Sequence, residues 1–427
     1  MSFNEWKHEE FGKVPYDWGV SKLGNHITTL TDYHANGSYE KLKENVELLD
    51  DEDYAIMIRT TNFEQNSFDR NSFKYITKSA YEFLEKSKVF PNDILMNKIA
   101  NAGSVYLMPN LKRPVSLAMN LFLIRINNNE INQKYAYYFL KNYEAYVKTR
   151  ASGSVTKTIT KENVRNLEIA YPNIMEQNSI VSILSAIDKK VELNNQMNKK
   201  LEETAQAIFK SWIVDLVPFK DGELEESEIG LIPKGWRVGC LNDIVNQITK
   251  TCHRKEIPSG SRYIGLEHIP RRQLVLCEYG DIEEVASDKL SFSQYDLLFG
   301  KIRPYFHKVS IAPWDGYCST DVIVLAPKIK EFYGYAVLTI YSDIFVQFAV
   351  QISQGTKMPR AEWKVLKDYK LIIPPDDIMH SFNNVILPIL ERMLLNSEES
   401  SRLVQIRDTI LPKLMSGTIR VPLEVNI

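Results

Sequence analysis

Apolar positions recur in alternating steps of four and three between residues 180 and 212. The positions that share this spacing are Ile180, Leu184, Ile187, Val191, Asn194, Asn198, Leu201, Ala205, Ile208 and Trp212. This heptad spacing is typical of a helix that packs along its length against another long helix. We therefore predict a long helix here, with a seam formed by these side chains.

The same pattern returns 202 residues later, at Phe382, Ile386, Ile389, Met393, Asn396, Ser400, Leu403, Arg407, Ile410 and Leu414. Among the pairs of positions 202 residues apart, only Ala205 and Arg407 clearly differ in the character of the side chain. Asn194 and Asn396 are the same residue type. Two interpretations of these asparagines stay open. They pair and fix the register of the two helices, or they face a partner subunit.

Each heptad helix closes a segment whose pattern indicates strands and short helices. In the first half we predict strands over 54–59, 93–99, 121–126 and 167–171. We also predict a helix over 135–147, whose stripe of aromatic side chains belongs to the core. In the second half, the stretches 263–266, 296–303 and 369–373 repeat this plan.

The duplication predicts an α+β fold, with two pseudo-symmetric globular α/β domains separated by two long antiparallel helices that form a coiled coil. The predicted parts are a first domain over 1–173, a helix over 174–217, an exposed acidic linker over 218–229, a second domain over 230–375, a helix over 376–417 and a tail over 418–427. At roughly 1.5 Å per residue, such a helix seam is a rod of about 50 Å.

Composition narrows the class of protein. Apolar residues make up 44% of the 427 residues and charged residues 25%, as in globular proteins, and no apolar run is long enough to predict a membrane span. The N-terminus is polar, and the four cysteines form no C-x-x-C pair. These features predict a cytoplasmic protein with free thiols. The spacing of Cys252, His253, His268 and Cys277 matches no zinc finger, so we predict no metal site.

Charge is unevenly distributed along the chain. The net charge is −2, but residues 38–85 carry 6 Lys and Arg against 11 Asp and Glu, whereas residues 86–165 carry 13 against 4. Segregated positive charge can form a local surface that binds phosphates, although any single lysine is more often plain solvated surface.

No catalytic motif is present. The sequence contains no G-x-G-x-x-G after a predicted strand, no phosphate-binding G-x-x-x-x-G-K-[ST], no G-x-S-x-G and no H-E-x-x-H. The D-x-K triplet at Asp188 lies inside the first heptad helix, where charges are ordinarily solvated. A duplicated chain without a catalytic motif favours a recognition or scaffold protein over an enzyme.

Several short features occur in the same order in both halves. They are the Pro-x-x-Trp heads at Pro15 and Pro233, the strands running into Lys98 and Lys301, the glycine loops at Gly153 and Gly355, and the heptad helices. Because these features occur twice in this order, the chain resembles the specificity subunit of type I restriction-modification systems over essentially its whole length.

That resemblance implies a non-catalytic subunit of a bacterial or archaeal complex. Each globular domain would then be a target-recognition domain that reads one half of a bipartite, asymmetric site in double-stranded DNA. The helices would set the spacing and dock methyltransferase subunits, two of them by expectation, and restriction (translocase) subunits would join through the complex. No cofactor is expected on this chain; S-adenosylmethionine, ATP and magnesium are expected on the partners.

On this interpretation, polar and basic residues at strand ends and glycine loops are the candidates for DNA binding. Arg suits bidentate contact with guanine, and Asn suits adenine. The candidates are Arg59, Thr60, Thr61, Asn62, Lys98, Arg150, Lys157, His268, Arg271, Arg272, Lys301, Arg303, Lys357 and Arg360. Two alternatives stay open: a coiled-coil adaptor that binds only proteins, and a standalone DNA methyltransferase or nuclease with an unrecognised motif.

Overall fold

The structure is a computed structural model that describes residues 6–63, 68, 70, 72–126, 129–153, 156–355 and 357–421. The predicted tail over 418–427 therefore lies partly outside the described residues. The chain divides into two compact units: the first comprises Met1–Ile187 and Ile406–Ile427, and the second comprises Asp188–Gln405.

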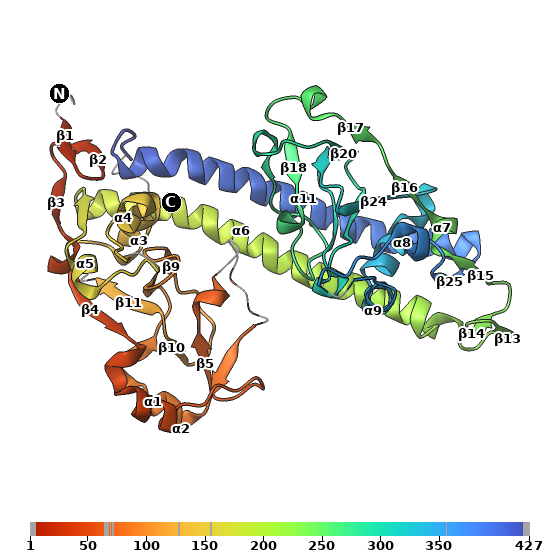
Figure 1. Cartoon of the computed structure of the whole chain (residues 1–427), viewed down its shortest axis with the longest axis horizontal. Coiled ribbons are helices and arrows are strands. Elements are labelled where there is room, and N and C mark those ends of the chain that lie inside the picture. The colour runs from red at the N-terminus through yellow and green to blue at the C-terminus, as the bar shows by residue number, and fades with distance from the viewer. Residues whose placement is uncertain are drawn as a thin grey trace. The chain divides into compact units, whose positions relative to one another are not determined.

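Two long helices run through the chain (Figure 1). Helix α6 covers Ile174–Phe209 and continues as a π-helical turn over Lys210–Val214, and helix α11 covers Asp376–Met415. Both begin six residues before the first predicted seam position: Ile174 lies two residues after Pro172, and Asp376 directly follows Pro375.

Contacts within each unit show that the helices pair in antiparallel fashion. In the second unit, Lys190 forms an ion pair with Glu399 at 3.0 Å, and further along α6 the Asn198 amide donates to the carbonyl of Met393 at 3.0 Å. In the first unit, the last turns of α11 and the early turns of α6 share one hydrophobic cluster. The predicted seam positions are buried or partly buried along both helices.

The asparagines of the seam form a hydrogen-bonded layer in the second unit. The Asn194 amide donates to the backbone carbonyl of Asn396 at 3.3 Å and to the Ser400 hydroxyl at 3.2 Å. The Asn396 amide donates to the Asn198 side-chain oxygen at 2.8 Å. Between the two open interpretations, the structure supports pairing across the helices, with Asn198 and not Asn194 as the side-chain partner of Asn396.

The globular part of the first unit contains two four-stranded sheets. One has the strand order β4-β11-β8-β9 and the other β6-β5-β10-β7, in which only β5 and β10 are parallel. Two-stranded pairs β12-β3 and β1-β2 complete it. The strands are β1 (Trp6–Glu9), β2 (Gly12–Pro15), β3 (Gly19–Lys22), β4 (Ile27–Asp32), β5 (Ala55–Ile58), β6 (Lys74–Ile76), β7 (Lys88–Val89), β8 (Ile94–Asn97), β9 (Val105–Leu107), β10 (Val115–Leu117), β11 (Leu121–Ile126) and β12 (Glu168–Tyr171).

The second unit repeats this topology with one additional strand, β17, at the edge of its second sheet. Its sheets have the orders β16-β24-β21-β22 and β17-β20-β23-β18-β19, and its pairs are β15-β25 and β13-β14. The strands are β13 (Leu224–Ser227), β14 (Gly230–Pro233), β15 (Arg237–Cys240), β16 (Val245–Ile248), β17 (Thr251–Cys252), β18 (Arg262–Ile264), β19 (Gly280–Asp281), β20 (Lys289–Phe292), β21 (Leu297–Gly300), β22 (Val309–Ile311), β23 (Gly316–Cys318), β24 (Val322–Pro327) and β25 (Lys370–Ile373).

Short helices cover the sheets in both units. They are α1 (Tyr39–Asn45), α2 (Lys78–Phe83), α3 (Gln133–Asn142), α4 (Glu144–Thr149), α5 (Lys161–Arg165), α7 (Leu241–Ile244), α8 (Tyr333–Tyr341), α9 (Asp343–Gln351) and α10 (Trp363–Leu366). The aromatic stripe of 135–147 belongs to the core, as predicted, since Tyr135, Tyr138 and Phe139 are buried. The prediction of one continuous helix is wrong, because the chain leaves the helical region at Tyr143, between α3 and α4.

Equivalent hydrogen bonds confirm the internal repeat. The Tyr135 hydroxyl donates to the carbonyl of Ala170, and the Tyr335 hydroxyl donates to that of Ile372. Burial in the core raises the pKa of Tyr335 well above its usual value. The acidic stretch before the second domain is exposed, as predicted, and part of it pairs as β13 with β14 in a hairpin.

Within the described part of the chain, no single helix is both long and apolar enough to cross a membrane, although the bent pair Lys330–Tyr341 and Asp343–Gln351 passes on length and composition together.

Candidate nucleic-acid interface

Equivalent strand ends position Lys98 and Lys301. Each lysine directly follows an inner strand of a four-stranded sheet, β8 or β21. The Lys98 carbonyl accepts from the amide of Ile159, and the Lys301 carbonyl accepts from the amide of Ala361, both at 2.9 Å. The backbone of both lysines is thus held in the same way.

The side chains of these lysines have different surroundings. Lys98 forms an ion pair with Asp32 at 2.6 Å, and Lys161 lies 3.2 Å from the same carboxylate. Burial by itself raises the pKa of Asp32, but hydrogen bonds and positive charge from the two lysines outweigh it, so that the pKa lies below its usual value. Among the described residues, Lys301 has no acidic partner within ion-pair distance.

Basic side chains of the second domain gather at one loop. Arg303 follows β21 with a positive φ of 50°, and its amide donates to the carbonyl of Pro359 at 2.8 Å. Its guanidinium donates to the carbonyl of Lys357 at 3.4 Å, and the nearby Arg360 lies 3.8 Å from Asp321. Arg303, Lys357 and Arg360 are exposed. The structure therefore brings three predicted residues together with Lys301 beside them.

Three further candidates in the second domain make local contacts. Nδ1 of His268 accepts from the amide of Gly265 at 2.9 Å, and burial lowers the pKa of His268. The Arg271 guanidinium lies 3.9 Å from the ring centre of Phe306. Arg272 forms an exposed ion pair with Asp343 at 2.9 Å.

In the first domain, the turn after β5 is largely structural. The Asn62 side chain is 0% exposed and accepts from the amide of Arg59 at 2.9 Å. The Arg59 guanidinium donates to the carbonyl of Ser72 at 2.6 Å. Of the four residues of this turn, Thr61 is exposed, and Arg59 and Thr60 are half-buried.

The glycine loop of the first domain carries the remaining two candidates. Arg150 forms an ion pair with Glu10 and lies 5.0 Å from the ring centre of Tyr146. Lys157 is exposed. The two loops therefore differ in how many of their cations are accessible.

Sequence inspection missed Asn242, Lys364 and Lys367, which lie beside Lys301 around a polar pocket. They come from segments far apart in the chain, and no motif marks them. The available signal was the 202-residue repeat itself, which aligns Lys364 and Lys367 with Glu162 and Arg165 of the first domain.

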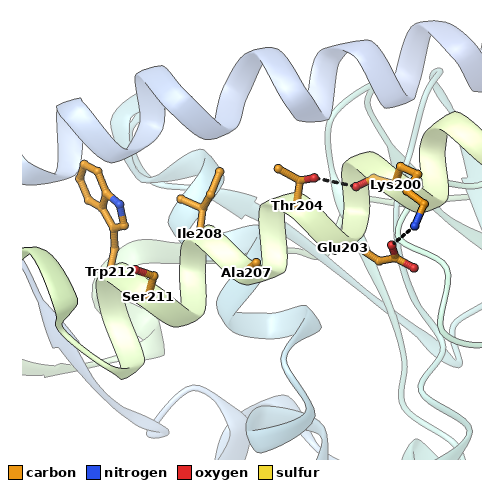
Figure 2. Close-up of a pocket in the computed structure, with 7 residues that line it drawn as sticks. All are labelled: Lys200, Glu203, Thr204, Ala207, Ile208, Ser211 and Trp212. Carbon is orange, nitrogen blue, oxygen red and sulfur yellow. Dashed lines mark hydrogen bonds and ion pairs between the residues drawn. The ribbon is translucent and has the colours of Figure 1, made fainter.

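Helix α6 carries a shallow groove, shown in Figure 2, with a volume of about 450 Å³. Its lining side chains are spaced along one face of the helix: Lys200, Glu203, Thr204, Ala207, Ile208, Ser211 and Trp212. Lys200 and Glu203 form an ion pair at 2.9 Å at one end. The groove is charged at this end, and its apolar side chains, Ala207, Ile208 and Trp212, lie toward the other end.

No group of three or more His, Cys, Asp or Glu in the described residues is arranged to hold a metal ion. The candidate zinc ligands of the second half make other contacts, since His253 pairs with Asp288 at 2.8 Å and Cys277 lies beside Gln273.

A duplicated α+β domain with basic loops at equivalent strand ends, joined to two heptad helices, defines a class of modular recognition protein. The family of the type I restriction modification DNA specificity domain matches residues 15–203 and 233–406, and this chain belongs to that family. The predicted family, fold class and non-catalytic role are thereby confirmed.

Similar proteins agree with this assignment. The type I restriction enzyme MjaIX specificity subunit of Methanocaldococcus jannaschii is 26% identical over 98% of this chain and 97% of its own length. The HindI specificity subunit of Haemophilus influenzae is 22% identical over 78% of this chain and 83% of its own. The crystal structure of the S subunit from M. genitalium shares the fold, with a TM-score of 0.54 and 17% identity over 93% of this chain and 96% of that one.

Proposed function

We propose that this specificity subunit reads a bipartite, asymmetric DNA site, one half with each globular domain. The observation that carries the proposal is a duplicated scaffold with different side chains at equivalent positions. At the strand end, Lys98 and Ala100 of the first domain correspond to Lys301 and Arg303 of the second. The two domains share a backbone fold but present different side chains at equivalent positions. Because contacts to bases, and not contacts to phosphates, carry sequence information, this difference suits the recognition of two different half-sites.

The two long helices set the distance between the half-sites and dock two methyltransferase subunits. The groove along α6, with the apolar side chains of Ala207, Ile208 and Trp212 among its lining residues, supports this proposal. Restriction subunits join through the assembled complex. The methyltransferase subunits supply S-adenosylmethionine, and the restriction subunits supply ATP and magnesium, so this chain works without a cofactor.

Sequencing of modified bases in a host that carries or lacks this chain tests the function directly. Loss of one bipartite methylated motif on deletion is the expected result. An unchanged methylation pattern, with the methyltransferase still expressed, would contradict the proposal and favour an adaptor that binds only proteins.

The docking surface has its own test. Ala207→Arg places a long cation at the centre of the groove, and because Ala207 is exposed the helix itself tolerates the change. We expect weaker co-purification of the methyltransferase. Asn195→Arg, at another exposed position of α6, is the matched control and should co-purify normally. Equal co-purification of both variants would exclude the groove as the docking surface.

A further inference from the structure

A polar pocket of about 490 Å³ lies beside Lys301 in the second unit. Its charged and amide side chains are Lys301, Lys364, Lys367, Glu362, Asn242 and Gln247. Three lysines face one carboxylate, so the pocket carries a positive excess. We call these six residues the lysine pocket.

Backbone hydrogen bonds fix the walls of the lysine pocket. The amide of Asn242 donates to the carbonyl of Lys367 at 2.9 Å, which joins two walls that are far apart in sequence. The amide of Lys301 donates to the carbonyl of Asp321 at 3.1 Å. The backbone that carries these side chains is therefore fixed by the fold, and Glu362 is the one carboxylate among the residues that line the pocket.

The positive excess is smaller at the equivalent place in the first domain. There Lys98 replaces Lys301 and Arg165 replaces Lys367, but Glu162 replaces Lys364, and Asp32 pairs with Lys98 and Lys161. Asp32 lies opposite Phe122 in the pairing of β4 with β11. In the second domain, the pairing of β16 with β24 ends at Ile248 opposite Val324, so that the next residue, Thr249, takes the place of Asp32. The position of Asp32, which neutralises Lys98 in the first domain, is thus occupied by Thr249 in the second domain.

We propose that the lysine pocket binds a backbone phosphate of the DNA in the half-site read by the second domain. This proposal rests on the proposed function and adds to it an asymmetry: the second domain has a phosphate pocket and the first does not. Lysine ammonium groups serve as point charges toward phosphates, and amide groups donate to phosphate oxygens. The volume exceeds that of a single phosphate ion, and the half-buried ring of Trp363 lines the pocket beside the lysines, so a sugar-phosphate segment fits it better than a free anion.

The test uses the full-length chain assembled with its methyltransferase and a duplex that carries its methylated motif. Lys364→Gln and Lys367→Gln, singly and together, should weaken binding and lower the slope of log affinity against log salt by about one for each lysine. The methylated motif should not change, because phosphate contacts carry no base information. Lys330→Gln is the matched control: the same charge is removed from an exposed position of the same domain, outside the pocket.

A second variant imitates the first domain. Thr249→Asp should supply the missing acid, neutralise Lys301 and lower the salt slope by a similar amount, while thermal unfolding shows that the domain stays folded. If the wild-type complex prefers its motif but all pocket variants behave like Lys330→Gln, the pocket proposal is overturned while the proposed function stands. If the wild-type complex shows no preference for its motif, the proposed function itself fails.

Inorganic phosphate separates the two possible sources of the anion. For a DNA site, Lys364→Gln/Lys367→Gln should weaken DNA binding, and millimolar phosphate should compete with the duplex more strongly in wild type than in this variant. A rise in melting temperature with phosphate that is confined to wild type, with DNA binding unaffected by the substitutions, would assign the pocket to a free anion and overturn the proposal.

Discussion

The two strand-end lysines show how one acidic neighbour changes the role of a residue. Lys98 and Asp32 are mostly buried, with side chains 18% and 11% exposed, and each neutralises the other. Lys301 occupies the equivalent position without such a partner among the described residues. We infer that Lys98 contributes mainly to stability and Lys301 mainly to binding.

Lys98→Ala should therefore destabilise the first domain. The change leaves the Asp32 carboxylate with Lys161 alone, at a cost of about 1–3 kcal/mol in the free energy of unfolding at neutral pH. Because the pKa of Asp32 is lowered in the folded state, its ion pair stabilises the fold above the pKa of an unfolded aspartate, about 4, and this contribution is lost as the pH falls through the folded pKa. Urea unfolding at pH 7 and near pH 3 should show the difference between wild type and variant shrink with acid. A difference independent of pH would contradict the ion pair.

Arg303 combines exposure with an unfavourable backbone conformation, a pairing that recurs at functional sites. Arg303→Gly removes the guanidinium and relieves the positive φ. Because glycine also gains entropy in the unfolded state, we expect stability to change by no more than about 1 kcal/mol. Affinity for the second half-site should fall by about 1–3 kcal/mol if Arg303 contacts a guanine. Fluorescence anisotropy with duplexes mutated in either half-site measures this, with Arg303→Lys as the variant that keeps the charge.

Among the elements, the helix pair was the most predictable and the globular domains the least. Heptad spacing depends only on local order along a helix, so the seam from Leu184 to Ile208 could be identified from sequence. The extra buried positions of α11, such as Leu390 and Leu394, face the second domain and carry no heptad signal. Likewise, the break at Tyr143 depends on tertiary packing, which helical periodicity does not report.

The polar layer of the helix pair makes a prediction of its own. Asn396→Leu removes the donor to the Asn198 side-chain oxygen and should lower stability by about 1–3 kcal/mol, because a buried acceptor is left unsatisfied. Replacing Asn194, Asn198 and Asn396 together by leucine removes the whole layer and should restore or raise the melting temperature, at the expense of a unique register. A triple variant less stable than Asn396→Leu would show that the layer itself stabilises the fold.

At the scale of the whole molecule, the 202-residue repeat and the absence of catalytic motifs were enough to predict the class of protein. Individual site residues were harder. Asn62 and Arg59 carry the side-chain chemistry of base readers, yet they bond inward, whereas Lys364 and Lys367 face the lysine pocket without any sequence motif. Which surface cations are neutralised depends on neighbours distant in sequence, such as Asp32 for Lys98, and one sequence does not report these.

Strand pairing closes each globular domain near its own ends, and from this we predict that each domain can be exchanged. The second domain begins with β15 (Arg237–Cys240) and ends with β25 (Lys370–Ile373), which pair with each other. Replacing residues 237–373 by the equivalent segment of another family member should therefore fold, provided that the new segment packs on Phe209 and Phe382 of the helices. Methylome sequencing should then show a motif changed in one half only, with the other half and the spacer retained. Exchange of residues 19–171, closed by β3 and β12, is the reciprocal control and should change the opposite half. A hybrid that alters both halves would show that the domains do not read DNA independently.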